Sequence, residues 1–415
     1  MAKPAARVGF IQFCLLLGTL AVLAKAAQLQ LVEGDHWAAT ARVQRTVREE
    51  IPAWRGTIHD RSGMTLVGSQ LHYRVNIAPE QVRDTAALIR AVSKALDVPA
   101  ADLRRRFESG RRSIYVSGPF DAVTVHPIRS LPGVHLVPVY PRVGRTDLAR
   151  TTVGIFDIEK GAGVSGIERM LDSVLAGIPG ETVWLTDATR LARFASPARI
   201  GREPVRGNDV WLTIDARLQE IAEAAVDSAI RRMGAKGGNA IFLDPATGEL
   251  LAVASRVEGE RSAASAFTAP FEPGSTAKLF TAAALLEYGV VDSSDRVDGE
   301  NGRWHVEDTR RPYWITDVHV AKEPMTLETA VALSSNIGLA KFSRRLEQVQ
   351  LYDVLRRFGF GASTGLGFPA EADGAVPPPE EWLPGYTRES LSRGYNVNVT
   401  AIQLAAAYGA IANGG

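Results

Sequence analysis

The hydrophobic pattern begins with an apolar run near the N-terminus. Residues 8–24 are apolar except for Gln12 and Thr19, and the basic residues Lys3 and Arg7 precede them. A helix of about 17 residues is just long enough to cross a bilayer, and basic residues before such a helix favour a cytoplasmic N-terminus. We therefore predict a single-pass anchor in the inner (plasma) membrane, with the bulk of the chain extracytoplasmic.

A cleaved secretory signal is the alternative explanation of this run. Signal peptides have a shorter apolar core and a small-residue cleavage site, and Ala24-Lys25-Ala26 fits such a site. The length of the run and its amphipathic continuation through Leu29, Leu31 and Trp37 favour the retained anchor. Both explanations place the chain after about residue 30 outside the cytoplasm.

Strand-like and helix-like patterns alternate in the region that follows, residues 51–206. Alternating apolar residues predict short strands at residues 73–77 and 113–116, and apolar residues at helical spacing cover residues 83–96. A mixture of short elements of both kinds is typical of an α+β module. Residues 25–50 have a helical pattern and are expected to form a stalk between the anchor and this module.

The pattern becomes more regular after Gly207. Asp215 is a good N-cap for a helix, apolar residues follow at helical spacing as far as Met233, and Gly234 is placed to end the helix. Two apolar runs around a Pro/Gly turn then predict a β-hairpin over residues 239–254. The rest of the chain is mostly helix-like and loop-like.

These patterns divide the chain into three expected parts. Residues 1–30 are the cytoplasmic tail and anchor, residues 31–206 the stalk and pedestal module, and residues 207–415 a second α+β domain. This domain offers one clear hairpin among many helices. Because a stable sheet needs about three or more strands, we expect an incomplete antiparallel sheet, with apolar faces and one edge of the hairpin open to solvent.

Composition and charge exclude several classes of function. The chain has 47 basic and 46 acidic residues, and the net charge of +1 gives no general attraction to nucleic acid. Two clusters of arginines, at residues 104–106 and 111–112, are expected to lie on a solvated surface. Histidine and cysteine form no metal-binding motif, and the sequence contains no phosphate-binding glycine loop, so we expect neither a metal nor another cofactor. The one cysteine, Cys14, cannot form a disulfide within the chain.

The strongest chemical signal is a serine followed three residues later by a lysine. Ser275 and Lys278 share one face of a predicted helix that starts at Pro273-Gly274. A serine hydroxyl needs a base, and burial together with the helix dipole favours the neutral lysine that could be one. The same helix start aims backbone N–H groups at a developing oxyanion. We predict Ser275 as nucleophile and Lys278 as its base, with chance occurrence of a short pattern as the alternative.

A second candidate lies at a predicted helix junction, in Ser334-Ser335-Asn336. A hydroxyl and an amide at such a junction can relay a proton and hold a substrate carbonyl. Serine and asparagine also favour helix starts. Taken alone, these residues are therefore better explained by ordinary helix capping.

The two motifs in this order resemble the first two active-site motifs of the serine penicillin-binding proteins, 59 residues apart. Further motifs along nearly the whole chain resemble those of the membrane-anchored class B members, in the same order. They lie at residues 55–63, 163–168 and 175–180 in the pedestal and at residues 212–219, 244–249, 394–400, 403–405 and 412–415 in the transpeptidase domain.

The resemblance implies an α+β chain with a penicillin-binding/serine β-lactamase-like transpeptidase domain that cross-links peptidoglycan. Ser275 would attack the D-Ala-D-Ala carbonyl of a stem peptide, and the amine of a neighbouring stem would resolve the acyl-enzyme. Lys278 would be the base, Ser334 would help shuttle the proton, and Asn336 would orient Lys278 and bind the substrate amide. β-Lactams would acylate Ser275, and no cofactor would be needed.

The second motif, together with Glu272-Pro273-Gly274-Ser275, resembles the division-type enzymes more than the elongation type. The resemblance therefore implies septal wall synthesis. It also implies a membrane glycosyltransferase and other division proteins as partners.

The sequence departs from the family pattern in three places. Asn396 and Ala370 stand where glycines are usual, and both changes are expected to be tolerated. The third departure is larger, because the 415 residues contain no Lys-Thr-Gly or Lys-Ser-Gly. In the family this third motif lies on a strand that supplies an oxyanion donor. From its absence we expect a chain that is truncated before the motif, inactive as given and poorly folded in its C-terminal half.

Other classes of protein share part of this pattern. A membrane-anchored β-lactamase or β-lactam sensor would have the Ser-x-x-Lys motif, but the pedestal motifs argue against both. A non-catalytic, membrane-anchored scaffold of the wall-synthesis complex would keep the anchor and pedestal and tolerate loss of the active site. A broken gene or an incomplete record would leave the same absence, and the sequence does not choose between these last two explanations.

Overall fold

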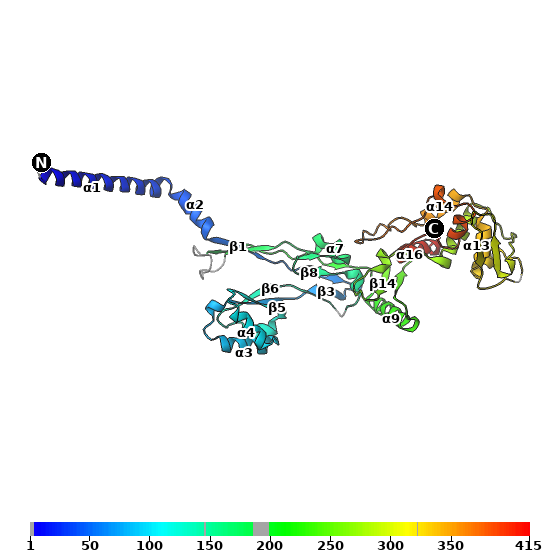
Figure 1. Cartoon of the computed structure of the whole chain (residues 1–415), viewed down its shortest axis with the longest axis horizontal. Coiled ribbons are helices and arrows are strands. Elements are labelled where there is room, and N and C mark those ends of the chain that lie inside the picture. The colour runs from blue at the N-terminus through cyan, green and yellow to red at the C-terminus, as the bar shows by residue number, and fades with distance from the viewer. Residues whose placement is uncertain (1–3, 145–146, 186–198, 322) are drawn as a thin grey trace. The chain divides into compact units, whose positions relative to one another are not determined.

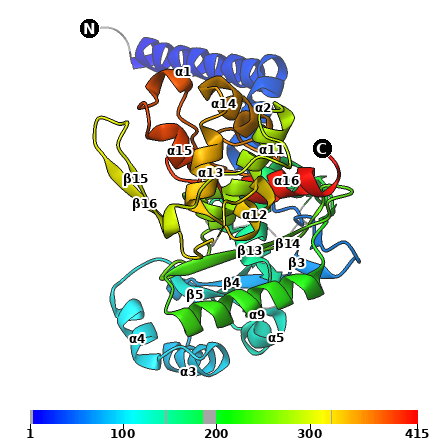
Figure 2. The ribbon, with the colours of Figure 1, turned by 90° about the vertical axis from the view of Figure 1, so that its right-hand side faces the viewer.

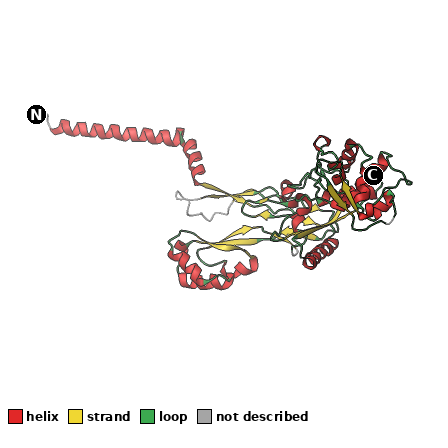
Figure 3. Ribbon diagram, turned by 45° about the vertical axis from the view of Figure 1, so that its right-hand side comes forward, coloured by secondary structure: helices red, strands yellow, loops and turns green. Residues whose placement is uncertain are grey.

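The computed structural model describes residues 4–144, 147–185, 199–321 and 323–415. The chain forms two compact units (Figure 1). The first contains residues 1–54 and 177–207, and the second contains residues 55–176 and 208–415. Helices and strands are mixed in the second unit, as the α+β prediction requires (Figure 3).

The first unit begins with the apolar helix that the sequence predicts. Helix α1 (Pro4–Ala27) continues through a π-helical turn, η1 (Gln28–Val32), into α2 (Gly34–Arg45). The segment Val8–Val32 is long and apolar enough to cross a membrane, and none of it is buried. A signal sequence would meet the same criteria of length and composition. The exposed apolar surface fits a single-pass anchor and not the core helix of a soluble domain.

A three-stranded antiparallel sheet completes the first unit. Its order is β1 (Thr46–Ile51), β10 (Gly180–Leu185) and β11 (Arg199–Arg202). The predicted helical stalk is therefore wrong at its C-terminal end, where residues 46–51 form a strand. Backbone pairing with β10 over six residues overrides the helical pattern there, and the β-branched residues of β1 suit a strand.

The pedestal part of the second unit contains three small sheets, of order β12-β2-β3-β7, β5-β4-β6 and β8-β9. The strands are β2 (Ile58–His59), β3 (Thr65–Ser69), β4 (His72–Ile77), β5 (Ile114–Asp121), β6 (Val134–Val139), β7 (Arg142–Gly144), β8 (Phe156–Asp157), β9 (Ala162–Gly163) and β12 (Val210–Trp211). The helices are η2 (Pro79–Gln81), α3 (Thr85–Leu96), α4 (Ala100–Glu108), α5 (Ala122–Val125), η3 (His126–Ile128), α6 (Arg150–Val153), α7 (Gly166–Met170) and α8 (Asp172–Leu175). The two strands and the helix predicted in this region are confirmed as β4, β5 and α3.

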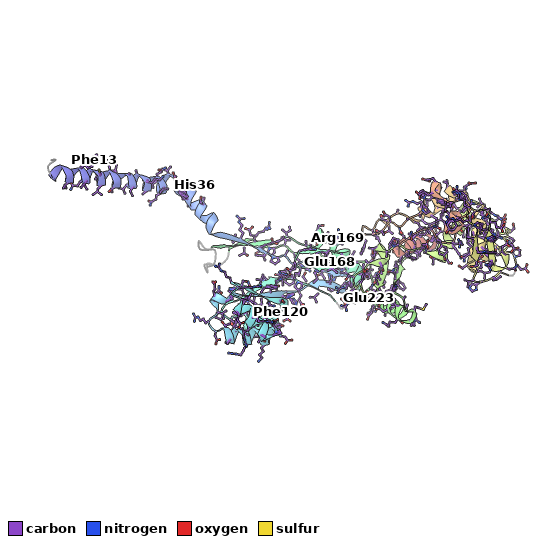
Figure 4. All side chains as sticks on the ribbon, viewed as in Figure 1. Phe13, His36, Phe120, Glu168, Arg169 and Glu223 are labelled. Carbon is purple, nitrogen blue, oxygen red and sulfur yellow. The ribbon has the colours of Figure 1, made fainter. Side chains whose placement is uncertain are left out.

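A buried ion cluster joins distant segments of the pedestal part, around Glu168 (Figure 4). The Glu168 carboxylate accepts hydrogen bonds from Arg55 Nε and from Arg142 Nε, each at 2.7 Å. Arg55 also pairs with Asp172 at 2.8 Å. Burial lowers the pKa of Arg142 below its usual value, and Glu168 opposes this shift. The carboxylate of Glu168 is therefore a counter-charge shared by two buried guanidinium groups.

The region after Gly207 starts as the sequence predicts. Helix α9 (Ala216–Met233) is capped by Asp215, which accepts two backbone N–H groups, and ends at Gly234 with φ 61°. Strands β13 (Gly237–Leu243) and β14 (Leu250–Val257) form the predicted hairpin, and α9 lies alongside it (Figure 2). The remaining elements are α10 (Ser265–Thr268), η4 (Gly274–Ala277), α11 (Lys278–Glu287), η5 (Glu300–Gly302), β15 (Arg303–Val306), β16 (Tyr313–Thr316), α12 (Leu327–Ala332), α13 (Asn336–Ser343), α14 (Gln348–Arg357), η6 (Pro379–Glu381), α15 (Thr387–Leu391) and α16 (Ala401–Ala412).

The hairpin is less exposed than the sequence predicts. Ala252, Val253 and Ala254 of β14 are fully buried, because α9 covers one face and α10 with α16 covers the other. On the edge of β14 away from β13, the Gln219 side-chain amide donates to the Val253 carbonyl and accepts its N–H, both at 2.8 Å. The Gln219 side chain thus fills backbone hydrogen bonds of Val253 that a neighbouring strand would otherwise fill. Both faces of β14 are covered, so the expectation of open apolar faces is wrong for this strand.

The largest hydrophobic core surrounds α11 and holds the start of that helix in place. Phe280, Phe342 and Phe360 are fully buried, and the Phe280 ring meets the Phe360 ring edge-on, with centroids 4.9 Å apart. Phe280 follows Lys278 by two residues. Packing of this aromatic core therefore fixes the part of the chain that carries the predicted nucleophile and base.

Candidate active site

Ser275 and Lys278 lie at the start of α11, as predicted. Ser275 is on the 3-10 turn η4, and Lys278 is the first residue of α11. Gly274 has φ 56°, a conformation that favours glycine, and so allows the sharp entry into the turn. Ser275 is exposed, whereas Lys278 is 2% exposed. The serine side chain is thus accessible, whereas the lysine side chain is shielded from water.

Lys278 is buried, and among the described residues no carboxylate accepts a hydrogen bond from its amine. Its Nζ donates to the Ser334 carbonyl at 2.5 Å and to the Ser334 Oγ at 3.2 Å. Burial lowers the pKa of Lys278 to about 8, with Asp317 opposing the shift and Arg393 adding to it. With that pKa about one amine in ten is neutral at pH 7, against about one in 3,000 for an unperturbed lysine. A lysine with this pKa is suited to the role of base that the sequence predicts for it.

Ser334 occupies a strained turn between α12 and α13. It is exposed, with φ 52°, in the left-handed region where a non-glycine residue costs roughly 1–2 kcal/mol. This conformation allows both its carbonyl and its hydroxyl to reach Lys278. Strain at a residue that holds the base is typical of a functional site.

Asp317 supports this turn and was missed by the sequence analysis. Its carboxylate accepts the Ser335 hydroxyl and the Asn336 N–H, each at 2.5 Å, and the Ile337 N–H at 3.1 Å. Ser335 Oγ also accepts the N–H of Gly338, as a helix N-cap does. Helix α13 is therefore capped twice. No local signal could reveal Asp317, because it lies 18 residues before Ser335 and reaches it only in the fold.

Asn336 follows this turn, but its side chain points to the β15–β16 hairpin and not to Lys278. Its Nδ2 donates to the Thr316 carbonyl at the end of β16, at 2.8 Å. The structure therefore brings Lys278 and Ser334 together, with Lys278 one turn after Ser275 on the same segment, and ties Asn336 to the β15–β16 hairpin. The alternative explanation of the second motif is partly right as well, since Ser335 is the capping residue and Ser334 is the one that contacts the lysine.

The segment 392–396 closes one side of the site. The Gly394 carbonyl accepts the Gly274 N–H at 2.9 Å, and a Cβ built on Gly394 would lie 2.0 Å from the Gly274 oxygen, so only glycine fits. The Asn396 N–H donates to Glu272 at 2.8 Å. Asn396 has φ 60°, and asparagine tolerates the left-handed region. The unusual asparagine thus keeps the backbone conformation expected of a glycine.

Comparison with known proteins identifies the family. Residues 50–212 match the penicillin-binding protein dimerisation domain and residues 238–415 the penicillin-binding protein transpeptidase domain. A probable peptidoglycan D,D-transpeptidase, PbpC of Pseudomonas aeruginosa, is 30% identical, covering 96% of this chain and 72% of that protein. This chain belongs to the class B penicillin-binding proteins. The family and the α+β fold inferred from the motifs are thus confirmed.

Other class B penicillin-binding proteins give the same picture. The peptidoglycan D,D-transpeptidase FtsI of Escherichia coli is 28% identical, covering 97% of this chain and 70% of that protein. The crystal structure of penicillin-binding protein 3 from Mycobacterium tuberculosis complexed with aztreonam superposes with a TM-score of 0.60 at 26% identity, covering 88% of this chain and 65% of that chain. Penicillin-binding protein 2X from Streptococcus thermophilus shares the fold with a TM-score of 0.69 at 22% identity, over 89% and 60% of the two chains.

Proposed function

We propose that this chain belongs to a peptidoglycan D,D-transpeptidase in which Ser275 forms an acyl-enzyme with the stem peptide. One observation carries the proposal. The buried amine of Lys278, with a pKa of about 8, donates hydrogen bonds to Ser334 and lies one turn after an exposed serine. A nucleophile and a base in this relation are what acyl transfer requires.

In the proposed acylation step, Ser275 Oγ bonds to the carbonyl carbon of the D-Ala-D-Ala peptide bond while neutral Lys278 takes the hydroxyl proton. The carbon–nitrogen bond then breaks, and the proton passes through the Ser334 hydroxyl to the amine of the departing D-alanine. The amine of a neighbouring stem attacks the ester, so that an amide forms and Ser275 regains its proton. The Ser275 N–H, at the start of η4, is proposed as one oxyanion donor.

Asn336 is proposed to orient Lys278 and bind the substrate amide. Its Nδ2 donates to the Thr316 carbonyl, which leaves the amide oxygen for an N–H group of the stem peptide. β-Lactams are proposed to acylate Ser275 in place of the peptide. No step of this chemistry calls for a metal or other cofactor.

The proposal extends to the membrane anchor, the domain boundaries and the partners of the enzyme. We propose that α1 is a retained single-pass anchor with a cytoplasmic N-terminus. We also propose that residues 1–30, 31–206 and 207–415 are the anchor, the stalk with pedestal, and the transpeptidase part. The FtsI relative supports a role in division, with a membrane glycosyltransferase among the partners.

Labelling by a fluorescent penicillin tests the proposed nucleophile and base. The 415 residues contain no third motif. The chain is therefore tested both alone and joined after Gly415 to the remaining C-terminal residues of the P. aeruginosa relative. In the joined protein, Ser275→Ala should abolish labelling, Lys278→Ala should nearly abolish it, and Ser334→Ala should slow it.

Ser293→Ala, a serine outside the site, is the matched control and should label normally. Labelling that persists in Ser275→Ala would place the chemistry elsewhere. A joined protein that folds but never labels would reject the enzymatic proposal. In the 415-residue chain alone, we expect little labelling.

A further inference from the structure

A cavity of about 560 Å³ lies in the pedestal part and is lined by residues of α4 and of the start of β5. Both elements belong to the same lobe (Figure 1). The volume is in the usual range for ligand sites, about 300–1,000 Å³. Three arginines line the cavity, Arg105 and Arg106 from α4 and Arg111 from the loop that follows. None of the lining residues belongs to the candidate active site, so this cavity is a separate concave surface.

The surroundings of the cavity are strongly basic. Residues 102–115 contain five arginines and two acidic residues, which leaves a local net charge of +3, whereas the whole chain has a net charge of +1. Asp102 is the one acidic residue that lines the cavity, and its carboxylate pairs with Arg105. Arg111 is exposed, and no carboxylate in the described part of the chain forms an ion pair with it or with Arg106. A carboxylate is thus already the partner of one arginine, and two guanidinium groups remain open to others.

The hydroxyl groups that line the cavity are available as acceptors. Ser109 Oγ donates its proton to the Arg106 carbonyl at 2.7 Å, and Ser113 Oγ donates its proton to Asn76 Oδ1 at 2.6 Å. A hydroxyl has only one proton, so each serine offers a ligand its oxygen lone pairs. A matching ligand therefore carries carboxylates for the arginines and N–H groups for the serines. An acidic peptide has both kinds of group, whereas a phosphate has no N–H group.

The frame of the cavity is fixed by contacts within the protein. Arg106 Nη1 donates to the Tyr115 carbonyl at 2.7 Å, which ties α4 to β5, an edge strand of its sheet. Leu103 and Ile114 are buried in the hydrophobic core of this lobe. Tyr115 also lines the cavity and is 47% exposed, so its ring offers apolar surface to a ligand. Groups that are held in place before binding lose less conformational freedom when the ligand arrives.

We propose that this arginine cavity, lined by Arg105, Arg106 and Arg111, is a docking site for an acidic segment of a partner protein. Carboxylates of the segment bind the arginines, and its backbone N–H groups donate to Ser109 and Ser113. An arginine matches a carboxylate because its planar guanidinium donates two parallel hydrogen bonds. A membrane surface is a poorer fit, since a flat surface does not enter a concave site. The proposal is independent of the chemistry of the candidate active site.

Fluorescence anisotropy with an acidic peptide is the direct test. The probe is a short fluorescein-labelled peptide of alternating glutamate and alanine, added to the 415-residue chain in a non-ionic detergent at constant ionic strength. Arg111→Gln should weaken binding by about 3- to 10-fold, because one charged hydrogen-bonding partner is lost at a partly exposed site. The matched control is Arg231→Gln, which removes the same charge from an exposed arginine near the end of α9 and should bind like wild type.

Further probes separate an acidic peptide from other anions. The same peptide N-methylated at every alanine keeps its carboxylates but loses half of its N–H groups, and it should bind about 2- to 10-fold more weakly. Sodium pyrophosphate and vesicles of phosphatidylcholine with phosphatidylglycerol supply phosphate in free and membrane-bound form. Both should displace the labelled peptide poorly, and to the same extent from wild type and from Arg111→Gln.

Peptide binding that is unchanged in Arg111→Gln would overturn the inference. So would equal binding of a peptide with glutamine in place of glutamate, or of the N-methylated peptide. Pyrophosphate or vesicles that displace the peptide efficiently from wild type, and less so from Arg111→Gln, would assign the cavity to phosphate or to a membrane and would overturn it as well. These measurements need no acylation, so penicillin labelling tests the proposed function separately.

Discussion

The two buried cationic sites of the second unit are stabilised in opposite ways. In the pedestal part, Arg55 and Arg142 share the carboxylate of Glu168 at 2.7 Å. In the candidate active site, Lys278 donates to the carbonyl and hydroxyl of Ser334, and burial lowers its pKa to about 8. The two sites differ in the partner of the buried cation, which is a carboxylate in one and neutral oxygens in the other. The structural cations are paired with a carboxylate, whereas burial lowers the pKa of the lysine, which suits its proposed role as a base.

The largest effect is expected from removing the shared carboxylate in Glu168→Gln. Arg142 would lose its ion-pair partner and Arg55 would keep only Asp172, and breaking a buried ion pair in this way costs about 3–5 kcal/mol in the free energy of unfolding. Urea unfolding followed by tryptophan fluorescence measures the loss. The control is Glu159→Gln, whose pair with Arg74 is largely exposed on the acidic side and should hardly change the midpoint. Equal midpoints for both variants would show that the cluster is not structural.

Lys278→Met is expected to raise the free energy of unfolding, in contrast to Glu168→Gln. An apolar side chain of similar length removes a buried charge that forms no ion pair with any described carboxylate, which should raise the free energy of unfolding at pH 7 by about 1–3 kcal/mol. The two hydrogen bonds to Ser334 are lost, and this limits the gain. The same variant of the joined protein should not be labelled by penicillin. A Lys278→Met chain that is less stable than wild type would contradict the comparison.

The pH dependence of stability tests whether the pKa of Lys278 is lowered in the folded chain. Lys278 has a folded pKa of about 8, below its ordinary value of 10.5. Between these values the unfolded chain holds a proton that the folded chain has released, so stability rises with pH in this window. The advantage of Lys278→Met over wild type should therefore shrink by up to about 3 kcal/mol between pH 7 and pH 10.5. Urea unfolding of both proteins across this range measures it, and a constant difference would refute the lowered pKa.

The smallest effect concerns the strained turn that holds the lysine. Glycine relieves the positive φ of Ser334 and alanine does not, so Ser334→Gly should be more stable than Ser334→Ala by about 1 kcal/mol. Both variants lose the hydroxyl and should be acylated slowly by penicillin in the joined protein. Thermal unfolding compares the pair, and equal stabilities would show that the turn carries no strain.

Much of the local structure followed from short-range patterns. The N-cap at Asp215 and the C-cap at Gly234 bound α9 as predicted, and the turn between the two apolar runs forms the hairpin. The errors occurred where distant segments meet. β1 forms because β10 pairs with it, and the edge of β14 is covered by the side chain of Gln219. Neither partner is visible in a window of local sequence.

The sequence by itself determined the family and predicted the nucleophile with its lysine, because both depend on residue types at fixed spacings in the chain. Only the tertiary structure decided which groups set the chemistry of that lysine. Its contact with Ser334 lies 56 residues away in the chain, and Asp317 and Arg393 act on it from separate loops. The pKa of a buried group depends on its burial and on the charges packed around it. Those quantities do not exist until the chain has folded.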